Sequence, residues 1–158
     1  MERSRPVTAA RVSNAATGRP SASARMICTT EGQSEIAKTL GVDTTRPLVP
    51  TWADHVFSCA YVYATGEMTL SVKELRDIRA VSAYFVTVRA RLGVRSTWDG
   101  LGQGAFTTPG DSVVVRKDDK VLVVDVHGLP DQFGVPRQPR RDAALSVAAT
   151  IMGCWTGA

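Results

Sequence analysis

The sequence predicts an α+β fold, an antiparallel sheet of four to five strands in two hairpins with about three helices packed on it. Two observations predict this class. Segments rich in β-branched and aromatic residues come in pairs that short polar turns join, and three other segments place apolar residues at helical spacing. Because tight turns join antiparallel strands, we expect the helices to cover one face of this sheet, in two layers.

Residues 1–27 are expected to be a disordered Ala/Ser/Arg-rich tail or linker, and residues 28–158 a single α+β domain. The tail has no aromatic residue and no apolar periodicity, so it cannot bury enough surface to offset the entropy of ordering. It lacks the apolar run of a signal peptide, and its composition also fits a transit peptide or a spacer behind a membrane anchor.

The first half of the domain predicts a short helix followed by a hairpin. Thr30 and Gln33 have the spacing of a capping box, and Gly41 ends a helix over about residues 31–40. Residues 42–53 are expected to form a loop. Strands over 55–63 and 68–73 follow, with a turn at 64–67 between them.

The second half repeats this order of elements. An apolar stripe from Ile78 to Leu92 predicts a helix that Gly93 ends. Residues 98–106 form a glycine-rich turn region, and strands over 111–116 and 121–127 form the second hairpin. Residues 128–139 are expected to be a loop, after which Asp142 caps a last helix.

The distribution of charge argues against a nucleic-acid partner. The formal net charge is +4. Five arginines and one acid in residues 1–27 account for all of it, and the rest of the chain has as many acidic as basic residues. A nucleic-acid surface needs a basic face on the domain itself. No stretch approaches the roughly 18 apolar residues that span a membrane.

The motifs indicate no catalytic site, no metal site and no cofactor. The turn Gly100–Gly104 follows a loop and precedes a strand, whereas a phosphate-binding loop joins a strand to a helix. Asp125 and His127 share a strand face, as a base and its orienting acid would, but no nucleophile motif accompanies them. Trp52 and Trp98 are the candidate ligand-binding residues because both are expected in or beside loops.

Three cysteines are present, Cys28, Cys59 and Cys154. Their spacing matches no zinc site. One disulfide with one thiol left over and three buried free thiols both remain open at this stage.

From Cys28 onward the chain resembles the small secreted lipoproteins of actinobacteria, a family known only as a domain of unknown function. The residues that carry the resemblance are Cys28-Thr29-Thr30-Glu31, Leu40-Gly41, Cys59-Ala60-Tyr61, Ala83-Tyr84-Phe85, Gly100-Leu101-Gly102-Gln103-Gly104-Ala105 and Val113-Val114-Val115-Arg116-Lys117. The resemblance covers about residues 28–157. It implies an α+β domain held at the outer face of the membrane by a lipid on an N-terminal cysteine.

The resemblance also implies a disulfide between Cys28 and Cys59, with Cys154 as the odd cysteine, and it brings no enzymatic activity. The chain departs from the pattern at its start, where no lipobox is visible, so we expect either a start upstream of Met1 or a copy that has lost export.

Two functional hypotheses follow. The first is a non-catalytic extracytoplasmic domain of the cell envelope, or a secreted one, that binds a protein, glycan or lipid. The alternative is a cytosolic enzyme or accessory domain that uses the Gly100–Gly104 turn together with Asp125 and His127.

Overall fold

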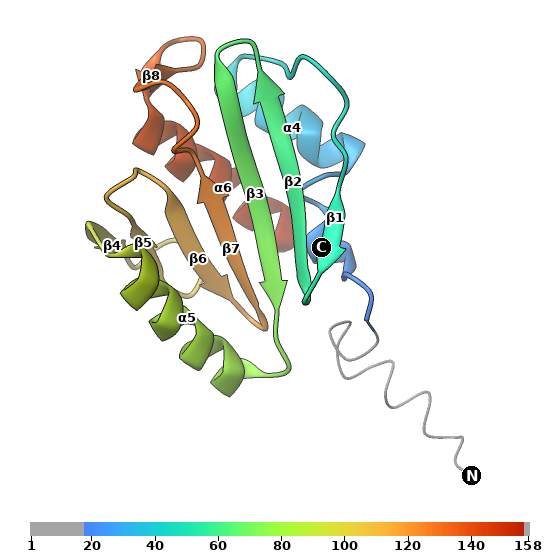
Figure 1. Cartoon of the computed structure of the whole chain (residues 1–158), viewed down its shortest axis with the longest axis vertical. Helices are drawn as coiled ribbons and strands as arrows, with labels where there is room; N and C mark the ends of the chain where they lie inside the picture. Colours follow the sequence, from blue (N-terminus) through green and yellow to red (C-terminus); the bar gives the residue numbers. More distant parts are fainter. Residues whose placement is uncertain (1–17, 157–158) are drawn as a thin grey trace.

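The main sheet has seven antiparallel strands, in the order β1-β2-β3-β7-β6-β5-β4 (Figure 1). The computed structural model describes residues 18–156. In chain order the strands are β1 (Thr51–Ala53), β2 (Val56–Tyr63), β3 (Gly66–Glu74), β4 (Ser96–Trp98), β5 (Ala105–Thr107), β6 (Val113–Lys117) and β7 (Lys120–Asp125). A small second sheet pairs β8 (Gln132–Phe133) with β9 (Gln138–Pro139).

The predicted class is confirmed as α+β with an antiparallel sheet, but the predicted four to five strands were too few. The added strands β1, β4 and β5 have only three residues each. Segments this short show no alternation that would distinguish a strand from a loop. Strands β1 and β5 pair with the longer neighbours β2 and β6, and β4 pairs with β5, so it is the pairing that makes them strands.

The described residues form four helices, which lie on both faces of the sheet instead of the one expected (Figure 1). They are α3 (Ala22–Arg25), α4 (Thr30–Leu40), α5 (Ile78–Leu92) and α6 (Arg140–Thr156). The helices α4 and α6 pack on one face over the larger core, and α5 packs on the other over a second, smaller core. The fold therefore has three layers. None of the described helices is long and apolar enough to cross a membrane.

The reason for the third layer lies in the central strands. Val113 and Val115 on β6 belong to the core under α6, whereas Val114 between them belongs to the core under α5. All three side chains are fully buried. A continuous apolar run is typical of a strand that is covered on both faces.

Both predicted hairpins are confirmed, and one pairing joins them. Cys59 lies opposite Leu70 in the first hairpin, and Val115 lies opposite Leu122 in the second. The two hairpins meet where β3 pairs with β7, with Leu70 opposite Val124. The sheet is thus continuous across two units that are separate in the sequence.

Ordered structure begins before the expected boundary at Cys28. Residues 18–27 pack into the domain, where Ala24 and Ile27 are fully buried. The prediction of a tail over 1–27 was therefore wrong for this stretch, and its remaining part, residues 1–17, lies outside the described residues. The overall composition of residues 1–27 gave no indication that the apolar side chain of Ile27 is buried in the domain.

Helix ends were predicted less well than helix positions. Thr29, not Thr30, is the N-cap of α4, since its side chain accepts a hydrogen bond from the Gly32 amide. Helix α5 has the predicted bounds. Helix α6 begins at Arg140, two residues before the expected cap at Asp142.

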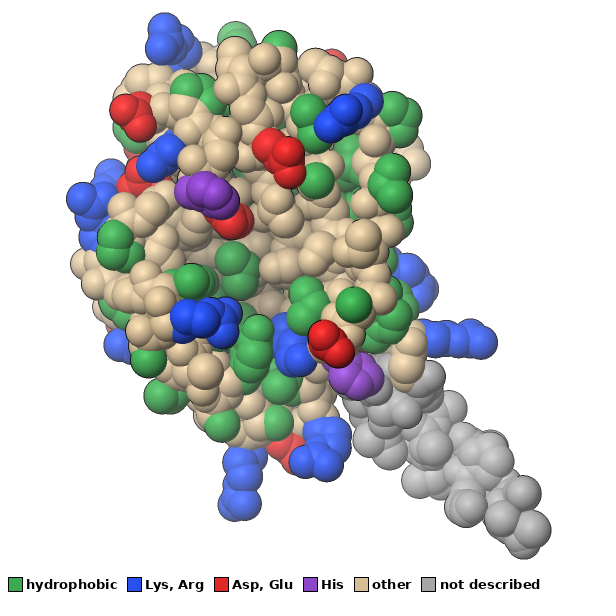
Figure 2. Space-filling model, viewed as in Figure 1, with side chains coloured by type: hydrophobic (Ala, Val, Ile, Leu, Met, Phe, Trp, Pro, Cys, Tyr) green, Lys and Arg blue, Asp and Glu red, His purple; other side chains and the backbone are tan. Residues whose placement is uncertain are grey.

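Half of the sheet has one face that none of the described helices covers. On this face β2 and β3 present residues that are partly exposed, such as Ser58, Ala60, Thr69 and Ser71. Figure 2 shows a hollow over the middle of this face, with charged side chains mainly around its rim. The opposite face of the same strands is buried under α4 and α6.

Candidate functional site

The stretch Gly18–Cys28 is held against the domain by side chains from distant elements. The Trp52 indole donates to the Gly18 carbonyl at 2.7 Å, and the Trp155 indole donates to the Ser23 carbonyl at 2.8 Å. The buried carboxylate of Glu74 accepts from the Ser21 amide at 3.2 Å. This stretch therefore has a fixed position beside α4.

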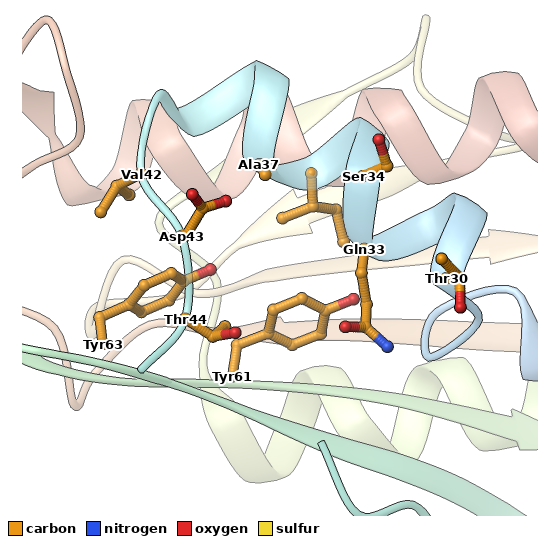
Figure 3. A pocket seen from close by; sticks show the side chains of 10 residues that line it. Thr30, Gln33, Ser34, Ala37, Val42, Asp43, Thr44, Tyr61 and Tyr63 are labelled. Carbon is orange, nitrogen blue, oxygen red and sulfur yellow. The ribbon is translucent and has the colours of Figure 1, made fainter. Parts of the chain in front are cut away.

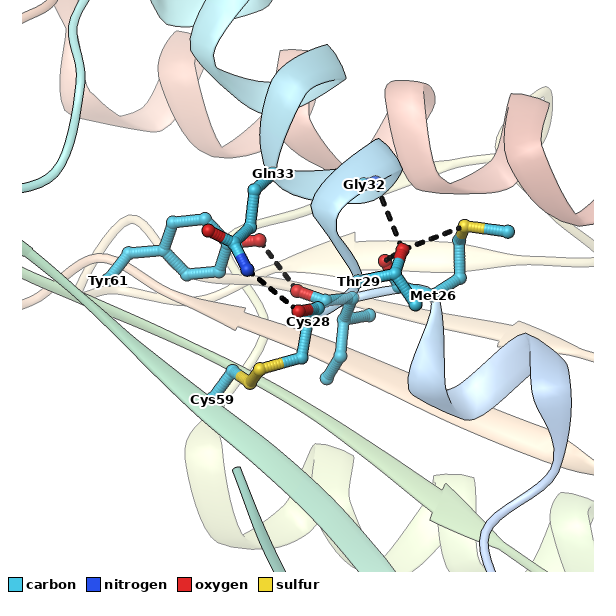
Figure 4. Close-up of a disulfide and its surroundings, with 8 residues drawn as sticks. Met26, Cys28, Thr29, Gly32, Gln33, Cys59 and Tyr61 are labelled. Atoms are coloured by element: carbon cyan, nitrogen blue, oxygen red, sulfur yellow. Dashed lines mark hydrogen bonds between the residues drawn. A yellow bond between two sulfur atoms is a disulfide. The ribbon is translucent and has the colours of Figure 1, made fainter. Parts of the chain in front are cut away.

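A disulfide between Cys28 and Cys59 covalently closes this arrangement (Figure 4). It joins the residue just before the N-cap of α4 to the middle of β2, with Cα atoms 6.0 Å apart. The pairing that the family resemblance implied is therefore present. Cys154 is the free cysteine, and burial followed by the charges of Glu31 and Glu35 raises the pKa of its thiol.

A pocket of about 300 Å³ lies next to the disulfide, between α4, residues 42–44 and β2 (Figure 3). Its floor is formed by Tyr61 and Tyr63, which point from β2 toward the helix. The other side chains that line it are those of Thr30, Gln33, Ser34, Ile36, Ala37, Val42, Asp43 and Thr44. The pocket thus combines hydroxyl, amide and carboxylate groups with a small apolar wall.

Two of these polar groups are held by the backbone that precedes α4. The Tyr61 hydroxyl donates to the Ile27 carbonyl at 2.6 Å, and the Gln33 side-chain amide donates to the Cys28 carbonyl at 2.8 Å (Figure 4). Both carbonyls belong to the stretch that the disulfide ties to β2. The disulfide and the pocket are therefore parts of one local structure.

Both tyrosine hydroxyls remain protonated at neutral pH. Burial raises the pKa of Tyr61 well above its ordinary value. Burial also raises the pKa of Tyr63, and the neighbouring Tyr61 and Asp43 raise it further. A neutral phenol can donate or accept a hydrogen bond, so these groups can recognise a ligand but do not act as bases.

The two predicted ligand-binding tryptophans do not lie together. Trp52 is on β1 and Trp98 is on β4, the two opposite edges of the seven-stranded sheet. The Trp52 indole is occupied by Gly18 and packs edge-on against His55, with ring centroids 5.7 Å apart. Trp98 is 43% exposed, and its indole donates to Ser96. They cannot line a single groove.

Asp125 and His127 do meet, as the strand spacing predicted. The imidazole Nδ1 lies 2.6 Å from Asp125 Oδ1, which also accepts from the His127 amide and from Ser112 Oγ. A carboxylate only accepts, so Nδ1 carries the proton. The pair borders a cavity of about 240 Å³ on the uncovered sheet face, and the His127 side chain is 77% exposed.

The Gly100–Gly104 turn lies far from that pair. Gln103 bonds Arg116 and Asp118 at one end of β6, whereas Asp125 bonds Ser112 at the other end. A Cβ atom at Gly102 would lie 2.8 Å from the Arg116 carbonyl oxygen, and its φ is +59°. Glycine is required here because two backbone segments approach closely, so the turn and the pair do not form one site.

Comparison with protein-family models, curated proteins and solved structures finds no match to this chain. Among the described residues, no group of three or more His, Cys, Asp or Glu side chains lies close enough together to hold a metal ion.

Sequence reasoning did not single out the residues of the pocket. The alternation of β2 places Tyr61 and Tyr63 on one face, but aromatic residues on a buried face usually belong to the core. Gln33 and Asp43 lie on α4 and in the loop after it, 18 or more residues from either tyrosine. The sequence feature that came nearest to indicating the pocket was the pair of polar Tyr hydroxyl groups on a strand face that was expected to be buried.

Proposed function

We propose that this chain is a non-catalytic, extracytoplasmic domain of the cell envelope that binds a partner and does not transform it. The observation that carries the proposal is the disulfide between Cys28 and Cys59. Disulfides persist in oxidising compartments and are rare in the cytosol, where thiols are kept reduced. The resemblance to the secreted lipoproteins of actinobacteria supports the same compartment.

The surroundings of the disulfide also favour a structural bond over a redox-active one. It anchors a stretch whose Ala24 and Ile27 are fully buried and whose backbone accepts hydrogen bonds from Tyr61 and Trp155. Opening the bond would remove the covalent link between this stretch and β2. A structural bond of this kind fits an oxidising compartment.

A binding role is supported by the kind of polar groups that the pocket offers. Tyr61, Tyr63, Gln33 and Asp43 surround a space large enough for a small ligand. Raised tyrosine pKa values make the phenols hydrogen-bonding groups without nucleophilic character at neutral pH. Recognition needs such groups, whereas acyl or phosphoryl transfer also needs an activated nucleophile.

The proposal is tested by mapping the cysteines in protein isolated from its own cells. Thiols are blocked at the moment of lysis, the chain is digested without reductant, and peptides are identified by mass. We expect a peptide that links Cys28 to Cys59, with Cys154 alone blocked, and accessibility of the domain to protease added outside the cell membrane. Three blocked thiols in a protease-protected protein would overturn the proposal.

One observation favours a second function, acid–base chemistry at His127. The 2.6 Å contact to Asp125 leaves Nε2 of the neutral ring as an exposed acceptor. Ser112 Oγ bonds to Asp125 and not to the imidazole, so a serine nucleophile is not in place. Turnover of chromogenic ester or phosphate-ester substrates that His127→Ala abolishes and His55→Ala leaves intact would support this function; equal turnover in both variants would remove it.

A further inference from the structure

The pocket between α4 and β2 presents placed hydrogen-bond acceptors beside hydroxyl groups that can donate or accept. Tyr61 Oη donates its only proton to the Ile27 carbonyl, and Gln33 Nε2 donates to the Cys28 carbonyl. Their remaining capacity for a ligand is mainly the lone pairs of Tyr61 Oη and Gln33 Oε1. A bound group that donates protons can therefore use these two side chains as acceptors.

The charge of the pocket has one sign. Asp43 is the only charged side chain among the described residues that line it, and a carboxylate accepts hydrogen bonds and has no proton to give. Figure 3 shows the Asp43 carboxylate above the Tyr63 ring and the Gln33 side chain reaching down toward Tyr61. The acceptors thus come from α4, the loop after it and β2, and they face a common space.

Part of the remaining wall is apolar, and the rest carries the hydroxyl groups of Thr30, Ser34 and Thr44. Ile36, Ala37 and Val42 line the pocket beside the polar groups. They offer contact to a hydrocarbon stem but make no hydrogen bond through their side chains. The faces of the tyrosine rings on the floor attract cations through the negative potential of the π-system.

From this arrangement we propose that the pocket binds a primary ammonium group carried on an apolar stem. An ammonium has three donors and no acceptor, which complements Asp43, Tyr61 and Gln33. An anion of the same size would face Asp43 with no opposing positive side chain among the lining residues. A neutral alcohol would supply one donor and leave the carboxylate without a counter-charge. The inference rests on the proposed function only in treating the domain as a binding module.

The test compares three ligands of one shape on the oxidised, full-length protein. Protonated phenethylamine, 2-phenylethanol and 3-phenylpropanoate are titrated at pH 7 while backbone amide signals are followed by NMR. We expect the ammonium compound to shift amides of residues 30–44 and 61–63 in a saturable way. The alcohol should bind at least ten-fold more weakly, and the carboxylate should give no shifts at these positions.

Two variants locate the effect. Asp43→Asn keeps the size of the side chain and removes its charge, so it should weaken ammonium binding at least ten-fold. Tyr63→Phe should weaken it by a smaller factor. The matched controls are Asp99→Asn and Tyr84→Phe, which carry the same changes at residues outside the pocket and should bind like the unmodified chain.

Three outcomes would overturn the proposal: no saturable shift with the ammonium compound, equal binding of the alcohol or carboxylate, and unchanged binding in Asp43→Asn. Preference for the alcohol or carboxylate would leave a binding domain with another ligand class, so the proposed function would survive. Free thiols at Cys28 and Cys59 in the native protein would overturn the proposed compartment without bearing on the ammonium site.

Discussion

The two halves of the main sheet are buried in different ways. Strands β2 and β3 alternate between buried and partly exposed residues along most of their length, because α4 and α6 cover one face and no helix within residues 18–156 covers the other. In β6 and at the start of β7, neighbouring residues such as Val121 and Leu122 are both buried, since α5 covers the second face. The two halves therefore differ in whether a helix covers their second face, and not in how their strands pair.

The difference shows that each half is stabilised by its own means. The doubly covered half has a second core, in which Phe85 packs edge-on against Phe106 with ring centroids 5.3 Å apart. The singly covered half carries the disulfide at Cys59 and the hydrogen bond from Tyr61 to the stretch before α4. Substitutions should therefore have unequal effects at equivalent positions in the two halves.

The largest effect is expected from a charge on the covered face. Val114→Asp places a carboxylate at a fully buried position under α5, which should cost several kcal/mol and leave the chain largely unfolded. Ser71→Asp, on the same face but outside the cover of α5, should cost about 1 kcal/mol or less. Circular dichroism and urea unfolding measure both; equal losses would show that α5 does not distinguish the halves.

The next largest loss of stability is expected for Phe85→Ala, because this substitution leaves a cavity in the second core. Removing a buried phenylalanine costs about 3–5 kcal/mol, and the edge-on contact with Phe106 is lost as well. Val86→Ala is the control on the same helix, since Val86 is 64% exposed and should change stability by about 0.5 kcal/mol or less. A free energy of unfolding that falls equally in both variants would contradict a second core.

Removing the disulfide is expected to cost about 3.5 kcal/mol. The double variant Cys28→Ser/Cys59→Ser frees a stretch of chain with a sequence separation of 31 residues, which raises the entropy of the unfolded state. The loss should appear in the urea midpoint and as increased proteolysis of residues 18–28. Cys154→Ser, at a partly buried free thiol, is the control and should be nearly neutral.

The smallest effect on stability is expected at acid pH and involves Asp125, which lies where β7 pairs with β3 at the border between the two halves. Burial raises the pKa of Asp125, but hydrogen bonds from the His127 side chain and amide, the charge of His127 and the Ser112 hydroxyl outweigh it, so the net pKa is lowered. A lowered carboxylate pKa stabilises the fold above the unfolded-state value and ceases to do so as the pH falls through the folded-state value.

Asp125→Asn should therefore be less stable than the unmodified chain at pH 6, and the gap should narrow below about pH 4. Because the Asp125 side chain is 37% exposed, solvent screening keeps the difference below about 1 kcal/mol. Urea unfolding across this pH range measures it. A gap that stays constant down to pH 2 would contradict the role of ionisation, and Asp99→Asn serves as the exposed control.

The sequence predicted the elements whose signals are local. Helix α5 was predicted with its observed bounds, because its stripe repeats over four turns and Gly93 follows directly. The hairpins were predicted because alternation and turn residues lie next to each other in the chain. The burial of residues 18–27 was missed because it depends on partners such as Glu74 and Trp155, 53 and 132 residues away.

The candidate site was the least predictable part. Asp125 and His127 could be paired from the sequence because they lie two residues apart on one extended segment. The pocket beside the disulfide forms only when α4, residues 42–44 and β2 come together. None of these segments has a sequence motif that by itself indicates ligand binding. The orientation of its acceptors depends on carbonyls that only the folded backbone supplies.

Composition and periodicity by themselves determined the α+β class and the two hairpins, since each depends on residue types that are near in the chain. Tertiary structure decided that the sheet has seven strands and helices on both faces, that the ordered domain begins before Cys28, and that Tyr61, Gln33 and Asp43 face one cavity. These features depend on contacts between segments that are distant in the chain. Such contacts produce no periodic pattern in the sequence of any single segment.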